Sequence, residues 1–189
     1  MIRTLIVAAA MMLGLQAHSA TLSPVDMTAL TAVTVPTFTD IPLNVGDSTD
    51  YQLSGGGLFN GKAHIFVRES TADGIWVEQD IDLGAMGKQK VEALYDKNTG
   101  KVLKIIANGQ EQAIPDPSKM KVVETRQESV TVPKGTFACM YLKIHDTDKN
   151  TDTDVWINKD IPVGGMVKTT QPTQLGISIT LELTDFVKK

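Results

Sequence analysis

The segment KAHIFVRESTADGIWVEQDIDL, residues 62–83, decides the fold of this chain. Apolar and polar residues alternate on both sides of Asp73-Gly74. Alternation with a period of two is typical of a β-strand, and Asp-Gly between two such runs is a strong local signal for a hairpin. The segment therefore predicts two antiparallel strands, at 62–70 and 75–83.

Comparable runs follow along the rest of the chain. They are separated by turn-forming residues at 98–100, 108–109 and 164–165. None of the runs has the period of a long amphipathic helix. They predict further strands at 88–97, 101–107, 121–132, 136–145, 152–158, 166–171 and 177–187. We expect successive strands to pair antiparallel, as a meander.

Two of the predicted strands are apolar on both faces. The run 136–145 has Met140 and Leu142 on one side and Phe137 and Tyr141 on the other, and 101–107 is similar. Such strands need cover on both sides. With little helix predicted, the cover must be the curling of the sheet, a second sheet, the N-terminal segment or an apolar ligand. We predict a mainly β fold, a single curved antiparallel sheet forming a half-barrel or open barrel; a two-sheet sandwich is the alternative.

The first twenty residues have the three-part layout of a secretory signal peptide. Arg3 precedes an apolar run from Leu5 to Leu15, and small residues follow. Cleavage is predicted after Ser19 or Ala20. The apolar run is shorter than the roughly 20 residues that a membrane-spanning helix needs. The mature chain is therefore expected to be soluble, and periplasmic or secreted.

The mature chain is predicted to have two parts. Residues 21–49 are rich in Thr, Pro and Val and are expected to form an N-terminal arm. One short helix is possible there, because Ser23, Pro24 and Asp26 suit its cap and first turn. Residues 50–189 are expected to form the antiparallel β domain.

Composition argues against several classes of partner. Without Arg3 the chain has 18 − 1 = 17 basic and 22 acidic residues, a net charge of −5, and no cluster of Lys or Arg. Nucleic acids and anionic membranes both attract basic surfaces. We therefore expect neither as a partner.

The single cysteine, Cys139, lies far from the cleavage point and cannot form an internal disulfide.

No recognisable catalytic or cofactor motif is present. The chain lacks a His-Glu-x-x-His motif, a Gly-x-Ser-x-Gly elbow and a phosphate-binding loop. Cys139 and His145 lie on one predicted strand, about 20 Å apart at roughly 3.3 Å per residue, so they cannot form a nucleophile–base pair. The alternating acids Glu78, Asp80 and Asp82 are expected to face solvent. We predict a protein that is not an enzyme and has no metal or other cofactor.

The segment from Asp146 to Asp154 has two interpretations. Its oxygen donors at every second residue match the opening of a calcium loop. However, Thr151 stands where that loop needs a glycine, and Ile157 replaces its bidentate glutamate. The same Asp and Asn residues are typical of a hairpin turn. We favour the hairpin, and calcium binding is the alternative.

Three motifs follow in order in the C-terminal half. They are Pro133-Lys134-Gly135-Thr136-Phe137, a tryptophan strand at 154–158, and Gly164-Gly165 followed by Met166-Val167-Lys168. The pattern resembles a group of uncharacterised exported bacterial proteins. These are similar in architecture to the periplasmic lipoprotein carrier and its outer-membrane receptor, whose curved half-barrel holds acyl chains on its concave face. The resemblance implies that fold; the N-terminal half has no match, and the helices that plug the carrier's half-barrel are not apparent.

The leading hypothesis for function is a periplasmic binding or carrier protein for an apolar ligand, such as an acyl chain or a lipoprotein-like group. Large and flexible apolar side chains suit such a ligand, although plain core packing would explain them too. The alternative is a structural or protein-interaction module of a cell-envelope complex that binds through a sheet edge. A hydrolase is the third possibility. The candidate ligand-lining residues are Phe66, Leu94, Leu103, Ile105, Met140, Leu142, Trp156 and Met166.

Overall fold

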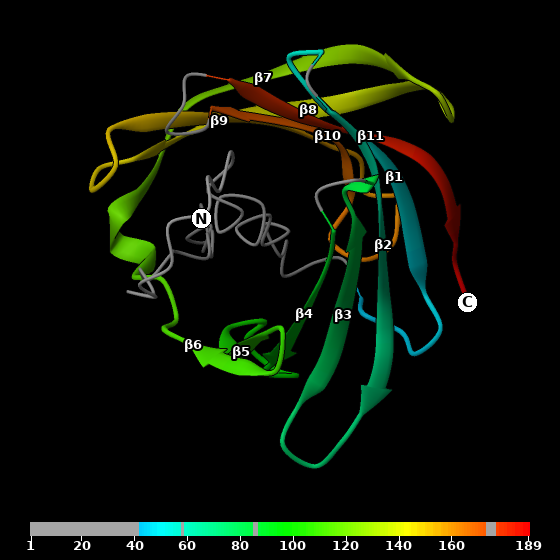
Figure 1. The fold of residues 1–189 in the computed structure, drawn as a ribbon, viewed down its shortest axis with the longest axis vertical. Helices are drawn as coiled ribbons and strands as arrows, with labels where there is room; N and C mark the ends of the chain where they lie inside the picture. Colours follow the sequence, from blue (N-terminus) through cyan, green and yellow to red (C-terminus); the bar gives the residue numbers. More distant parts are fainter. Residues whose placement is uncertain (1–41, 58, 85–86, 173–176) are drawn as a thin grey trace.

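The structure is a computed structural model that describes residues 42–57, 59–84, 87–172 and 177–189. Within these residues, eleven strands form one antiparallel sheet in the order β6-β5-β4-β3-β2-β1-β11-β10-β9-β8-β7 (Figure 1). The sheet is open, with β6 and β7 at its edges. This confirms the predicted fold class, a mainly β protein with one curved antiparallel sheet and little helix. The predicted signal peptide and the segment beginning at Ser23, for which a short helix was one possibility, lie outside the described residues.

The strands form two meanders. The first runs from β1 to β6 and the second from β7 to β11, and β11 pairs with β1 to join them. A short 3-10 turn, η3 (Pro117–Lys119), leads from the first to the second. No helix among the described residues has the length and hydropathy to span a membrane. The strands are β1 (Ser48–Gly55), β2 (Phe59–Ser70), β3 (Ile75–Asp82), β4 (Lys88–Tyr95), β5 (Val102–Ala107), β6 (Gln110–Gln112), β7 (Met120–Val132), β8 (Gly135–Asp146), β9 (Thr151–Ile157), β10 (Met166–Pro172) and β11 (Ser178–Val187).

All the strands predicted from the sequence are present. The opening segment forms β2 and β3, and Thr71 N donates a hydrogen bond to Gly74 O at 2.8 Å in the turn between them. Two strands were not predicted. β1 has only Tyr51 and Leu53 as apolar residues, and β6 is a three-residue polar segment. β1 has too few apolar residues to show a clear alternation, and β6 is too short.

Bulges explain how a single sheet curves. In several strand pairs, one residue of one strand has no partner opposite it. Such a β-bulge bends the strand and increases its twist. Figure 1 shows the resulting sheet curled into an open ring. One of these residues, Leu103, is 45% exposed, so the prediction that 101–107 is covered on both faces is wrong there. The residues with no partner opposite are Arg68, Leu103, Val123, Val167 and Thr184.

The two faces of the sheet differ in chemistry. The inner face, defined by Tyr51 and its cross-strand neighbours Ala63 and Ile81, carries most of the main apolar cluster; Cys139, on the outer face of β8, also belongs to it. Ile161 and Val163, from the loop between β9 and β10, belong to the same cluster. The outer face carries alternating charges. Met166 of β10 and Leu183 of β11 are members too, so the main cluster joins the first meander to the strands and the loop of the second.

Candidate functional site

The eight residues predicted to line a ligand site do not share one surface. The inner face carries Ile105, Met140, Leu142 and Met166. The outer face carries Phe66, Leu94 and Trp156, and Leu103 is exposed at the bulge of β5. The residues on the outer face have neighbours there; Phe66, for example, stacks on His64 with ring centroids 5.1 Å apart. The inner face is therefore the better candidate for an apolar ligand.

A separate apolar patch covers the inner face of β8 and β9. Leu142 lies opposite Val155, and Met140 lies opposite Ile157. It is distinct from the main cluster, onto which the β9–β10 loop packs. Among the described residues, the apolar side chains that pack against this patch are Met120 and Met140. We call the patch the β8–β9 cluster; its members are Leu142, Ile144, Val155 and Ile157, each 2–4% exposed.

The β8–β9 cluster lies next to a polar rim. On β7, at the edge of the sheet, Thr125 is opposite Leu142 and Gln127 is opposite Met140. Both rim residues are exposed. Branched aliphatic groups, flexible methionines and a polar edge together suit an amphiphile, with its chain on the cluster and its polar end at the rim.

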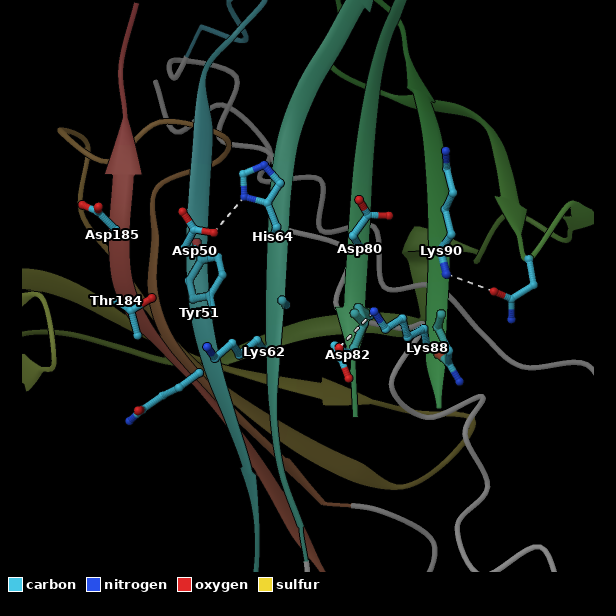
Figure 2. Close-up of a pocket in the computed structure, with 15 residues that line it drawn as sticks. Asp50, Tyr51, Lys62, His64, Asp80, Asp82, Lys88, Lys90, Thr184 and Asp185 are labelled. Atoms are coloured by element: carbon cyan, nitrogen blue, oxygen red, sulfur yellow. Dashed lines mark hydrogen bonds and ion pairs between the residues drawn. The ribbon is translucent and has the colours of Figure 1, made fainter. Parts of the chain in front are cut away.

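A pocket of about 940 Å³ lies over β1 to β4 and is lined mainly by outer-face residues. Figure 2 shows acids and bases alternating across the strands. The Asp50 and His64 side chains are 2.8 Å apart, and Lys88 Nζ lies 3.4 Å from Asp82 Oδ2. Because neither sign of charge is in clear excess, the pocket has no evident preference for an anion or a cation. Its charged lining residues are Asp50, Lys62, His64, Asp80, Asp82, Lys88, Lys90 and Asp185.

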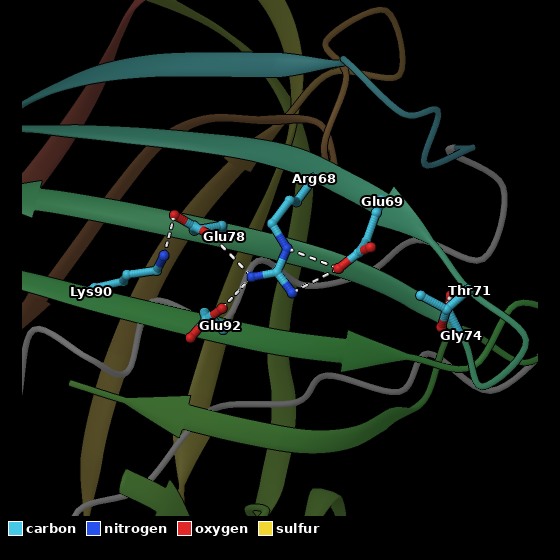
Figure 3. Close-up of polar contacts among 7 residues, drawn as sticks. All are labelled: Arg68, Glu69, Thr71, Gly74, Glu78, Lys90 and Glu92. Atoms are coloured by element: carbon cyan, nitrogen blue, oxygen red, sulfur yellow. Dashed lines mark hydrogen bonds and ion pairs between the residues drawn. The ribbon is translucent and has the colours of Figure 1, made fainter. Parts of the chain in front are cut away.

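A charge network beside this pocket corrects one prediction. Glu78 was expected to face solvent, but it is only 6% exposed. Arg68 lies 3.2 Å from it and also pairs with Glu69 and Glu92 (Figure 3). Lys90 Nζ lies 2.7 Å from Glu78, and this hydrogen bond raises the pKa of Lys90. Two cations from neighbouring strands therefore neutralise a buried acid. Asp80 is exposed, as expected.

Trp156 belongs to a cross-strand row on the outer face. Arg126 lies 3.5 Å from the ring centroid of Tyr141, and Tyr141 contacts Trp156 with centroids 5.2 Å apart. Lys168 Nζ lies 5.6 Å from the Trp156 ring. The indole N–H donates to Glu128; this bond, followed by Arg126, lowers the pKa of that carboxyl. The row fastens β7, β8, β9 and β10 together, which gives Trp156 a structural role.

Cys139 and His145 both lie on the unbroken strand β8, as the sequence predicted. Cys139 is 1% exposed, and burial raises the pKa of its thiol to about 11. His145 Nδ1 instead lies 2.8 Å from Asp152 Oδ1. A thiol with a raised pKa is a poor nucleophile near neutral pH.

The segment 146–154 forms the hairpin that the sequence analysis favoured. A turn at 147–150 joins β8 to β9, and Asp146 Oδ1 accepts hydrogen bonds from Asp148 N and Lys149 N. Asp152 pairs with His145, so the carboxylates are committed to separate partners. Within the described ranges there is no group of three or more His, Cys, Asp or Glu side chains placed to hold a metal ion.

Sequence reasoning missed several residues of the β8–β9 cluster. Ile144, Val155 and Ile157 were placed on strands but not on the ligand surface. The signal was available: folding 136–158 about the turn at 147–150 brings Leu142 opposite Val155. Met120 could not be found this way because its position depends on the β7–β8 register.

Comparisons with known proteins add similarity of fold alone. No protein-family model and no curated protein matches the chain. The hypothetical protein CT021 from Chlamydia trachomatis matches with a TM-score of 0.47 and 13% identity, over 76% of this chain and 87% of that one. MucB matches with a TM-score of 0.44 and 12% identity, over 79% of this chain and 55% of MucB. A chain from the Pseudomonas aeruginosa MucA/MucB complex matches with a TM-score of 0.45 and 14% identity, over 75% of this chain and 50% of that one. This chain therefore spans about half of the matched MucB chains.

Proposed function

We propose that this protein is an exported binding or carrier protein that holds an apolar ligand with a flexible chain, such as an acyl chain, on the inner face of its sheet. The signal-peptide layout of the first twenty residues supports export. The proposed site is the β8–β9 cluster, with the polar rim on β7 beside it.

The observation that carries the proposal is the composition and position of this cluster. Its four aliphatic residues are separate from the main core and have methionines as their apolar neighbours. Burying apolar surface stabilises a complex by roughly 0.8 kcal/mol per methylene, so even a short acyl chain gains several kcal/mol. Thr125 and Gln127 on the rim would leave a polar end group in contact with water.

The proposal is for binding without catalysis. Cys139 is buried with a raised pKa, and His145 is paired with Asp152. The acids that contact a base in the outer pocket, Asp50 and Asp82, have His64 and Lys88 as partners. These pairings support a protein whose charged groups stabilise the sheet.

The test begins with mature protein purified from the cell envelope without detergent. Native mass spectrometry and organic extraction would show a bound species of acyl-chain mass. A fluorescent fatty-acid probe then gives the affinity of the emptied protein. Leu142→Gln should weaken probe binding about tenfold or more, because it places an amide on the apolar surface. Leu103→Gln is the matched control: the chemical change is the same, but Leu103 is 45% exposed on a different strand, and binding should not change.

Two outcomes would contradict the proposal. The first is wild-type protein that carries no lipid and does not bind the probe. The second is equal binding by Leu142→Gln and wild type, with circular dichroism showing both folded. Either result would favour the alternative, an interaction module of an envelope complex with a filled interior.

A further inference from the structure

Strand β7 is a long, free edge of the sheet. It runs from Met120 to Val132, thirteen residues, and is the terminal strand on its side. Residues 121–127 are all exposed, and among the described residues only β8 pairs with it. Figure 1 shows it along the rim of the curled sheet. The opposite edge, β6, has only three residues and offers little for pairing.

The central part of β7 has a regular backbone. Its bulge lies at Val123, and the register with β8 is continuous from Glu124 to Val132. Along a strand in an antiparallel pair, every second residue directs its N–H and C=O groups toward the paired strand, and the residues between them direct theirs to the opposite side. Val132 and Gly135 flank the two-residue turn at 133–134, so the backbone groups of Val132 point toward β8. Gln127 is an odd number of residues, five, before Val132, so its N–H and C=O groups point away from β8, to the free edge.

The charges on this stretch are self-complementary when the strand is paired with its own copy. A two-fold axis through Gln127 places Arg126 opposite Glu128 of the second copy. By symmetry, Glu128 lies opposite Arg126 of the second copy. Thr125 then lies opposite Ser129 of the second copy. An axis through Arg126 would instead place Arg126 against itself and Glu124 against Glu128. An axis through Thr125 would also place Arg126 opposite Glu124, but it would bring the bulge at Val123 within two residues of the centre.

We propose that two copies of this chain pair antiparallel along β7, about a two-fold axis through Gln127. The two sheets then continue as one, and each copy loses its long free edge. Unpaired edges of this length are usually blunted in natural proteins by pairing, charge or cover. The facing charges favour this register over the one centred on Arg126, and the bulge at Val123 disfavours the one centred on Thr125. The inference does not depend on the apolar ligand.

The first test measures self-association by sedimentation velocity over a range of concentrations. Wild type should dimerise. Gln127→Pro should raise the dimer dissociation constant about tenfold or more, because it removes the N–H that each copy donates at the centre of the interface. The bond network with β8 does not use this N–H, and proline is tolerated on edge strands. Gln127→Ala keeps the N–H and is the matched control; it should dimerise like wild type.

A cross-linking test fixes the register and does not rely on the proline variant folding. Facing residues in an antiparallel pair have Cα atoms about 4.5–5.5 Å apart, within disulfide reach. Gln127→Cys should therefore form a disulfide-linked dimer under mild oxidation. Thr125→Cys should not, because its copies would lie about 13 Å apart at roughly 3.3 Å per residue. Wild type, whose Cys139 is buried, controls for background.

Each contrary result overturns the proposal. A wild type that remains monomeric at every concentration excludes the dimer. A dimer that survives Gln127→Pro uses another surface. A disulfide formed by Thr125→Cys and not by Gln127→Cys excludes the assigned register.

Discussion

Gly61 provides a quantitative test of the curvature of the sheet. It lies on β2, and a Cβ atom built there would be 2.5 Å from the Asp82 carbonyl oxygen at the end of β3. Optimal separations between non-bonded heavy atoms are about 3.5 Å, so Gly61→Ala creates an overlap of about 1 Å. Both atoms are fixed to backbone, and neither can rotate away. The cost should lie at the upper end of the range for overpacking, about 3 kcal/mol.

The assay is thermal and urea unfolding followed by circular dichroism. For a domain of this size about 3 kcal/mol corresponds to a fall in Tm of about 10 °C. Gly109→Ala is the control, because its Cβ would meet nothing within 4 Å while its φ of +80° remains unfavourable for alanine. That variant should lose about 1 kcal/mol. If Gly61→Ala is as stable as Gly109→Ala or more so, the strands do not approach as closely as the structure shows, and the reasoning is refuted.

Three further predictions concern individual groups. Tyr51→Phe should lose about 1–2 kcal/mol in urea unfolding, because the Tyr51 hydroxyl donates to Met166 O at 2.9 Å in the core, and the carbonyl would lose this partner. Burial raises the pKa of Cys139 to about 11, so native protein at pH 8 should resist alkylation that is complete in urea; rapid alkylation of the native protein would contradict its burial. Trp156→Phe removes the hydrogen bond that lowers the pKa of Glu128. A carboxyl whose pKa is lower in the folded state than in the unfolded chain, where it is 4.5, stabilises the fold at pH values above 4.5. In urea unfolding the variant should therefore be less stable than wild type at pH 7, and the difference in stability should narrow as the pH falls below 4.5.

The strands could be predicted because their signals are local. Alternation over six or more residues, bounded by turns such as Asp73-Gly74, needs no knowledge of the rest of the chain. β1 was not predicted because only Tyr51 and Leu53 are apolar in it, which is too few to show an alternation. Its place between β2 and β11 depends on pairing between residues more than a hundred positions apart, which no local pattern records.

The faces of the strands were harder to predict than the strands themselves. Phe66 and Trp156 were assigned to a ligand surface because they are large and apolar. They lie instead on the outer face, where Phe66 stacks on His64, and Lys168 lies over the Trp156 ring. Glu78 was assigned to solvent, but cations on neighbouring strands allow its burial. In each case the deciding contact comes from another strand, so the register had to be known first.

The arrangement of the apolar residues separates stability from binding. The main cluster runs from β1 to β5 and on into β10 and β11, and it includes Ile161 and Val163 of the β9–β10 loop, so both meanders contribute to it. The core that holds the two halves together is therefore formed without the β8–β9 cluster. On the outer face, the row through Arg126 and Trp156 fixes β7 to β10 by contacts that do not involve the inner side of these strands. Because both supports are independent of the β8–β9 cluster, its residues are free to be selected for a ligand, and this is the physical reason for placing the proposed site there.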